Sequence, residues 1–198
     1  MALNTYADLK TSILDWSNKT NLTAMAPDFV RLAESKIRKK LRTRDQLTAL
    51  PITLTDDLGS LPTDMLEVRS VVVDGNVLSY VPEEVYDQLA EFATDPINYT
   101  FSGSQIKVAG GGDSTARLDY YHAYTALSAA SDTNWVLTNA PEVYLYGSLV
   151  EAFDYLRDGV ERDRYMQKFE QTVAELNLTE KVSLSAGPMR VRPDTFTP

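Results

Sequence analysis

Cysteine is absent from the 198-residue sequence, and histidine occurs once, as His122. A chain without cysteine forms no disulfide, no thiolate metal site and no cysteine nucleophile. A single histidine excludes multi-histidine metal sites and leaves one possible version of a serine–histidine–carboxylate triad. We therefore expect no catalytic residue, no bound metal and no cofactor, and we expect a protein that is not an enzyme.

Long apolar runs are missing as well. No stretch approaches the roughly 18 uninterrupted apolar residues of a membrane-spanning helix. The opening residues, MALNTYADLK, lack the basic and apolar regions of a signal peptide. Hydrophobic residues make up 43% of the chain and charged residues 24%, as in ordinary folded domains. The sequence therefore predicts a folded protein with no membrane partner.

Positive charge is scarce and unevenly placed. The chain has 19 Lys and Arg against 28 Asp and Glu, a net charge of −9. Seven of the basic residues lie between positions 31 and 44, where Glu34 is the one acid, so the rest of the chain carries −15. These seven residues are Arg31, Lys36, Arg38, Lys39, Lys40, Arg42 and Arg44. The sequence predicts one basic helix on an acidic body.

Two interpretations of this basic helix stay open. It is either a solvated helix face, as charge runs commonly are, or a surface that pairs with the acidic surface of a neighbouring copy. A helix-turn-helix signature, an aromatic platform and an overall basic domain are all missing, so sequence-specific DNA binding is not expected. Under the second interpretation, six residues form the subunit interface: Arg31, Lys36, Arg38, Lys39, Lys40 and Arg42.

The hydrophobic periodicity changes twice along the chain. Helical spacing covers residues 5–18, where Thr5 and Asp8 form a capping box, and a second helix beginning near Pro27. Short β-branched and aromatic runs, with a turn at residues 74–76 and a short helix at 82–92, fill residues 46–123. Helices return at 141–155 and 160–182.

This pattern predicts an α+β fold. We expect a four-helix bundle formed by the N- and C-terminal helix pairs, in residues 1–45 and 128–182. An antiparallel β-rich insertion, residues 46–127, interrupts it, and residues 183–198 form an extended C-terminal tail. In that tail Met189, Val191 and Phe196 alternate with polar residues, which indicates either fraying or a segment that orders on a partner.

Two other functional interpretations compete. A hydrolase centred on His122 has no nucleophile elbow in the sequence, so a packed or surface histidine is favoured. A binding module for carbohydrate or a host-surface ligand would use the tyrosines of the β insertion, because aromatic rings stack on sugars. These tyrosines are Tyr80, Tyr99, Tyr120, Tyr121 and Tyr124.

Five segments spread over nearly the whole chain carry a family resemblance. They are TYADLKTSILDW, FVRLAESKIRKKLRTR, LPTDMLEVRSVVV, DTNWVLTNAPEVYLYGSLVEAFDYLRD and the closing GPMRVRP. Together and in this order they resemble the head-to-tail adaptor (connector) proteins of short-tailed bacteriophages.

The resemblance implies a structural virion protein without enzymatic activity, made in the host cytoplasm and placed at the head–tail interface. It implies a ring of about twelve copies, built from one repeated head-to-tail contact. That ring joins the portal protein to the tail nozzle or tail fibre proteins and forms part of the DNA conduit, passing genomic DNA without sequence-specific binding. It also places portal contacts on the tail residues Met189, Arg190, Val191 and Arg192.

Overall fold

The structure is a computed structural model that describes residues 3–185, with the side chains of 183–185 left aside. Within that range the fold is α+β and divides into two compact units, residues 3–8 with 45–140 and residues 9–44 with 141–185. The α-helices are α1 (Tyr6–Ser17), α2 (Ala26–Lys40), α3 (Glu83–Ala90), α4 (Trp135–Asn139), α5 (Pro141–Tyr155) and α6 (Gly159–Ser185). The strands are β1 (Leu47–Thr53), β2 (Leu58–Ser60), β3 (Met65–Val73), β4 (Asn76–Val77), β5 (Ser79–Tyr80), β6 (Asn98–Ser102), β7 (Gln105–Val108) and β8 (Thr115–His122).

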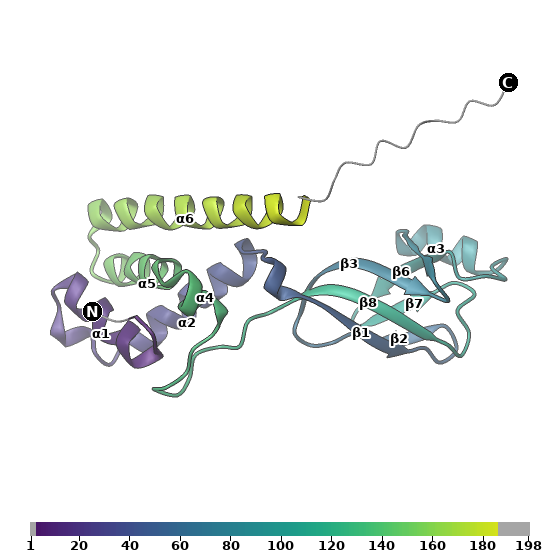
Figure 1. Cartoon of the computed structure of the whole chain (residues 1–198), viewed down its shortest axis with the longest axis horizontal. Helices are drawn as coiled ribbons and strands as arrows, with labels where there is room; N and C mark the ends of the chain where they lie inside the picture. The colour runs from purple at the N-terminus through teal and green to yellow at the C-terminus, as the bar shows by residue number, and fades with distance from the viewer. Residues whose placement is uncertain (1–2, 186–198) are drawn as a thin grey trace, which may run out of the picture. The chain divides into compact units, whose positions relative to one another are not determined.

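Two four-stranded sheets build the first unit (Figure 1). One has the order β1-β8-β3-β4 and is antiparallel, and the other has the order β2-β7-β6-β5, in which β5 runs parallel to β6. Both sheets contribute to one core, which includes Ile52, Val71 and Leu118 from the first and Tyr99 and Ile106 from the second. The sheets therefore pack face to face as a small sandwich.

After β3 the chain turns at residues 74–76 and then passes from the first sheet to the second. The sequence predicts this turn. Asp74 and Gly75 have φ angles of 51° and 83°, the left-handed conformations that a tight two-residue hairpin turn requires, and they join β3 to β4. Beyond this turn the chain forms two short strands, β4 and β5, which belong to different sheets. Leu78, between them, is buried in the shared core, so the chain changes sheets around this side chain.

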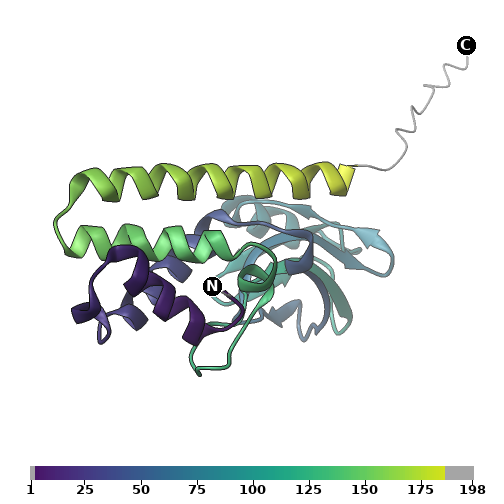
Figure 2. The same cartoon turned by 60° about the vertical axis from the view of Figure 1, so that its left-hand side comes forward.

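In the second unit α5 packs along α2 on one side and along α6 on the other. Close approach is possible because α5 has a glycine at the contact. A Cβ added to Gly147 would lie 3.2 Å from the Ala33 Cβ of α2 and 3.2 Å from the Phe169 ring of α6. Figures 1 and 2 both show α6, with 27 residues, running beside the 15-residue α5 and continuing past it.

The expected four-helix bundle is wrong, although the α+β class holds. Residues 3–185 form six α-helices, and two of them, α3 and α4, belong to the sandwich unit. Among the described residues α1 does not pack along another helix as α2, α5 and α6 do. Its first turn belongs to the sandwich unit, where Tyr6 N donates to the Asp132 carbonyl at 2.9 Å. Its last turn belongs to the second unit, where the Trp16 ring lies 6.3 Å from the Tyr146 ring.

Several local predictions are confirmed. Asp8 N donates to the Thr5 hydroxyl at 3.2 Å and Thr5 N to the Asp8 carboxylate at 3.1 Å, which is the expected capping box. Helix α2 has proline in its first turn. The sequence interpretation missed β2 and α4, and α4 is capped by Asn134, whose side chain accepts from Leu137 N at 3.0 Å.

Candidate functional site

The basic helix α2 has a buried face and an exposed face. Phe29, Ala33 and Ile37 are buried inside the second unit, to which α2 belongs. The opposite side exposes Arg31, Leu32, Ser35, Arg38 and Lys39 at spacings of three, four and seven residues, so these five side chains share one stripe. We refer to them as the basic face.

Two of the expected interface lysines point elsewhere. Lys36 Nζ forms an ion pair with the mostly buried Glu151 of α5 at 2.5 Å. Lys40 pairs with Glu170 of α6 and lies 5.9 Å from the centre of the Phe169 ring. Both lysines therefore join α2 to other helices of the same unit, and their charges are neutralised by carboxylates of the same chain.

Arg42 also has partners inside its own chain. Its guanidinium donates to the carbonyl groups of Leu41 at 2.7 Å and Arg38 at 3.0 Å, so it covers carbonyl oxygens that the end of α2 leaves open. By contrast, Arg31, Arg38 and Lys39 have no ion pair with any residue that the structure describes. These three charges are the part of the predicted interface set that remains available to another molecule.

The predicted portal-contact residues Met189, Arg190, Val191 and Arg192 lie outside the described residues. The placement of a partner on this segment stays a prediction.

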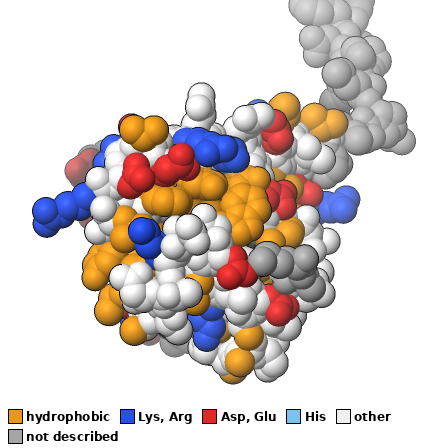
Figure 3. All heavy atoms as spheres, turned by 90° about the vertical axis from the view of Figure 1, so that its left-hand side faces the viewer, with side chains coloured by type: hydrophobic (Ala, Val, Ile, Leu, Met, Phe, Trp, Pro, Cys, Tyr) orange, Lys and Arg blue, Asp and Glu red, His pale blue; other side chains and the backbone are white. Residues whose placement is uncertain are grey.

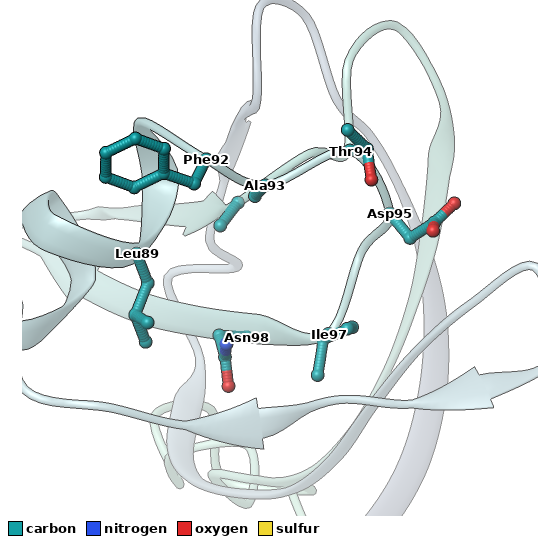
Figure 4. A pocket seen from close by; sticks show the side chains of 8 residues that line it. Leu89, Phe92, Ala93, Thr94, Asp95, Ile97 and Asn98 are labelled. Carbon is teal, nitrogen blue, oxygen red and sulfur yellow. The ribbon is translucent and has the colours of Figure 1, made fainter.

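A second surface, which the sequence interpretation missed, lies on α3. Val85, Leu89 and Phe92 are exposed at four- and three-residue spacing, with Phe92 79% exposed. Together with Ile97, which is 62% exposed, Leu89 and Phe92 line a shallow hollow of about 250 Å³ (Figure 4). Leu89 and Ile97 lie on opposite sides of this hollow in Figure 4. Such a group of exposed large apolar side chains marks an interaction site more often than it marks plain surface.

The exposed charges near this apolar group along the chain are negative. Asp87, Glu91 and Asp95 are exposed beside it, and no Lys or Arg occurs between Arg69 and Lys107. We refer to Val85, Leu89, Phe92 and Ile97 with these three acids as the acidic tip. Two signals in the sequence pointed to it: the spacing of the apolar residues on a short helix, and a stretch of 37 residues without a cation.

One carboxylate at the base of α3 is already paired. Lys107 Nζ donates to Glu83 at 2.7 Å, and this hydrogen bond holds the pKa of Glu83 below its ordinary value. Burial, with the nearby charges of Asp57 and Asp87, raises the pKa of Tyr86 on the inner face of α3 to about 12. The inner face of α3 is therefore fixed to the sandwich. The outer face of α3 and the residues that follow it, up to Ile97, carry the acidic tip.

The structure does not bring a catalytic set to His122. This residue ends β8, and its Nδ1 lies 2.9 Å from the Ala123 carbonyl, while Tyr124 stacks edge-on at 6.1 Å. Within residues 3–185 no serine or carboxylate hydrogen-bonds to its ring, and no group of three or more His, Asp or Glu side chains could hold a metal ion. In the same range no helix combines the length and apolar character needed to span a bilayer.

The tyrosines of the sandwich do not form one platform. Tyr99 and Tyr120 are buried, and Tyr124 stacks on Trp135 with ring centres 5.9 Å apart. Tyr80, 58% exposed beside Phe101, is the well-exposed member of the five. The carbohydrate-binding alternative therefore has much less surface than the sequence indicated.

Exposed apolar side chains also occur at one end of the helical unit. Figure 3 looks from that side and shows hydrophobic side chains gathered at its centre, with acidic and basic side chains around them. Trp16, Tyr155 and Val160 are exposed in this unit. Unlike the acidic tip, the surface in Figure 3 carries both signs of charge.

The described residues form a two-sheet sandwich and a helical unit that expose one basic and one acidic, apolar surface. Exposed surfaces of this kind are typical of a protein that binds other proteins. The family model described as SU10 adaptor protein matches residues 4–192. The chain belongs to the SU10 adaptor protein family, which indicates a structural, non-enzymatic adaptor protein of a phage virion that interacts with other virion proteins. None of the curated proteins matches the chain. The expected adaptor identity is confirmed at this level, and the connection to short-tailed phages stays a prediction.

Proposed function

We propose that the chain is the subunit of an adaptor ring at the head–tail interface, with the portal protein on one side and the tail nozzle or tail fibre proteins on the other. The family match over residues 4–192 carries this proposal, because it covers both units and most of the segment beyond them. The ring has about twelve copies, as the resemblance to connector proteins implies.

The charge distribution supports a ring built from one repeated contact. A net charge of −9 makes identical copies repel each other on average, so association needs a local patch of opposite sign. Arg31, Arg38 and Lys39 on the basic face supply it, since they have no ion pair among the described residues. A basic patch that meets an acidic patch makes a heterologous contact, which closes into a ring if the rotation permits.

Negative charge also suits a channel for DNA. Outside residues 31–44 the chain carries −15, and an acidic wall repels phosphates, so a duplex slides past it without binding. The portal contact belongs to Met189, Arg190, Val191 and Arg192, which supply two cations and two apolar side chains to a protein surface.

Sedimentation with the portal ring of the same phage tests this function. The full chain is expected to sediment with the portal, and the variant Arg190→Glu with Arg192→Glu is expected to stay near the top of the gradient. Lys19→Glu is the control for a change of surface charge, because Lys19 is exposed and belongs to neither proposed contact. A wild-type chain that does not sediment with a folded portal contradicts the proposal.

A further inference from the structure

We propose that the acidic tip is the acceptor for the basic face of the next copy in the ring. The inference rests on the proposed ring, for which it supplies the missing half of the subunit contact. The occupant is a second copy of this chain, with Leu32 of α2 entering the hollow between Leu89 and Ile97.

Both surfaces expose large apolar side chains that can pack against each other. Leu32 is 50% exposed on the basic face, one turn before Ser35 and two turns before Lys39. On the acidic tip, Phe92 and Ile97 are even more exposed. Burying one exposed leucine among apolar side chains removes apolar area from water on both partners at once.

The charged parts match in sign. Asp87 and Glu91 lie close to Leu89 and Phe92 along the chain, and Asp95 lines the hollow. None of these three acids has an ion pair within the part of the chain that the structure describes. Arg31, Arg38 and Lys39 on the basic face also have no ion pair with any described residue. Complementary rims of this kind steer association and select the partner, while the central apolar contact holds it.

The two surfaces lie on different units of the chain, so the contact joins unlike patches. The basic face belongs to residues 9–44, and the acidic tip belongs to residues 45–140. A contact between unlike patches leaves one of each free at the ends of any open chain. It therefore propagates from copy to copy until the chain closes, as a ring subunit requires.

Cysteine cross-linking tests this pairing, because the natural chain has no cysteine. Ser35 lies on the basic face, and Gln88 lies on α3 between Val85 and Leu89, and both are exposed polar residues. The double variant Ser35→Cys with Gln88→Cys places one thiol on each surface and keeps all the apolar and charged contacts. A short bismaleimide then joins only thiols that the contact brings together.

The matched control is Ser35→Cys with Gln105→Cys. Gln105 is exposed and starts β7, at the opposite end of the β6–β7 hairpin from Ile97. We expect the first pair to give a ladder of covalent oligomers beyond the dimer, both in concentrated protein and in protein bound to the portal. The control pair is expected to remain monomeric, and a mixture of the two single variants, Ser35→Cys and Gln88→Cys, is expected to stop at dimers.

The outcome separates this inference from the proposed function. Sedimentation with the portal but no ladder from the first pair overturns the inference and leaves the adaptor function standing. A ladder without portal sedimentation supports the subunit contact and contradicts the portal role. Cross-links from Gln88→Cys to a different virion protein instead of a second copy also overturn the inference.

Discussion

The side chain of Asn177 in α6 holds the end of α2 at Lys40. Its Nδ2 donates to the Lys40 carbonyl at 2.9 Å, and its Oδ1 accepts from the Arg42 N–H at 2.9 Å. One amide group therefore satisfies a carbonyl that the helix end leaves without an intrahelical partner, together with the N–H that follows it. This contact fixes where the basic helix stops against α6.

Replacing Asn177 by alanine is expected to destabilise the helical unit. The variant removes both hydrogen bonds, a part-buried one from the Arg42 N–H and an exposed one to the Lys40 carbonyl, at a cost of about 1 kcal/mol in the free energy of unfolding. Urea unfolding measures this directly. Gln171→Ala is the control, because Gln171 is an exposed α6 residue whose side chain bonds only to Glu175, and it should change stability by less than about 0.5 kcal/mol. Equal losses in the two variants would contradict this account.

Gly147 is expected to tolerate no larger side chain. Even a Cβ at this position would lie 3.2 Å from Ala33 and from the Phe169 ring, so Gly147→Leu forces α2 and α6 away from α5. We expect a loss of about 3 kcal/mol, from overpacking. Gly159→Ala is the matched control, since a Cβ there meets no atom within 4 Å and α6 begins at this residue. The midpoints of thermal unfolding of both variants are compared with that of the wild type. An unchanged midpoint for Gly147→Leu would show that the three helices do not meet at this residue.

Alkaline pH is expected to weaken the sandwich through Tyr86. Its pKa in the folded state is raised to about 12, above its ordinary value of 10.0, because burial disfavours the phenolate. The stabilisation is complete below pH 10 and is lost as pH rises towards 12, since the unfolded chain releases this proton first. Tyr86→Phe should therefore lose less stability than the wild type between pH 9 and about 12. Chemical unfolding gives the free energy of unfolding of both proteins across this range, relative to its value at pH 8. Parallel dependence of the two free energies on pH would contradict the prediction.

Reversing charge on either proposed contact surface is expected to block association, and mixing the two variants is expected to restore it. Arg38→Glu with Lys39→Glu makes the basic face acidic, and Asp87→Lys with Glu91→Lys makes the acidic tip basic. Each variant alone then presents two surfaces of like sign, whereas the mixture pairs unlike signs in alternation.

Analytical ultracentrifugation at low ionic strength measures this rescue, because surface charge is screened at high salt. Circular dichroism first confirms that both variants are folded. Reversal of Lys36 and Lys40 is a poor substitute, since both lysines hold Glu151 and Glu170 inside the chain. Association of either charge-reversed variant alone at the wild-type level would contradict the contact.

Much of the local structure followed from neighbouring residues. The capping box of Thr5 and Asp8 and the turn at Asp74 and Gly75 depend on residues within four positions, and both were predicted. The helix arrangement was not predictable in the same way. It depends on the space that Gly147 leaves between Ala33 and Phe169, three residues that are far apart in the sequence.

The candidate surfaces show the same division. The concentration of cations on α2 was evident from the sequence, but the use of Lys36 and Lys40 inside the chain depends on Glu151 and Glu170 in distant helices. On α3, the apolar spacing was present in the sequence. This spacing does not by itself predict an exposed surface, because a short amphipathic helix normally buries its apolar side. In α3 the buried residue is Tyr86, and the apolar residues Val85 and Leu89 stay exposed.

The mass of the complex with the portal ring is the first measurement to make on the proposed portal-bound adaptor. The full chain and the portal ring of its own phage are mixed, isolated by sedimentation and weighed by native mass spectrometry. We expect one adaptor chain per portal subunit in a closed ring, visible in negative-stain images of the same fraction. A portal ring that carries no adaptor, or an irregular number of adaptor chains, would contradict it.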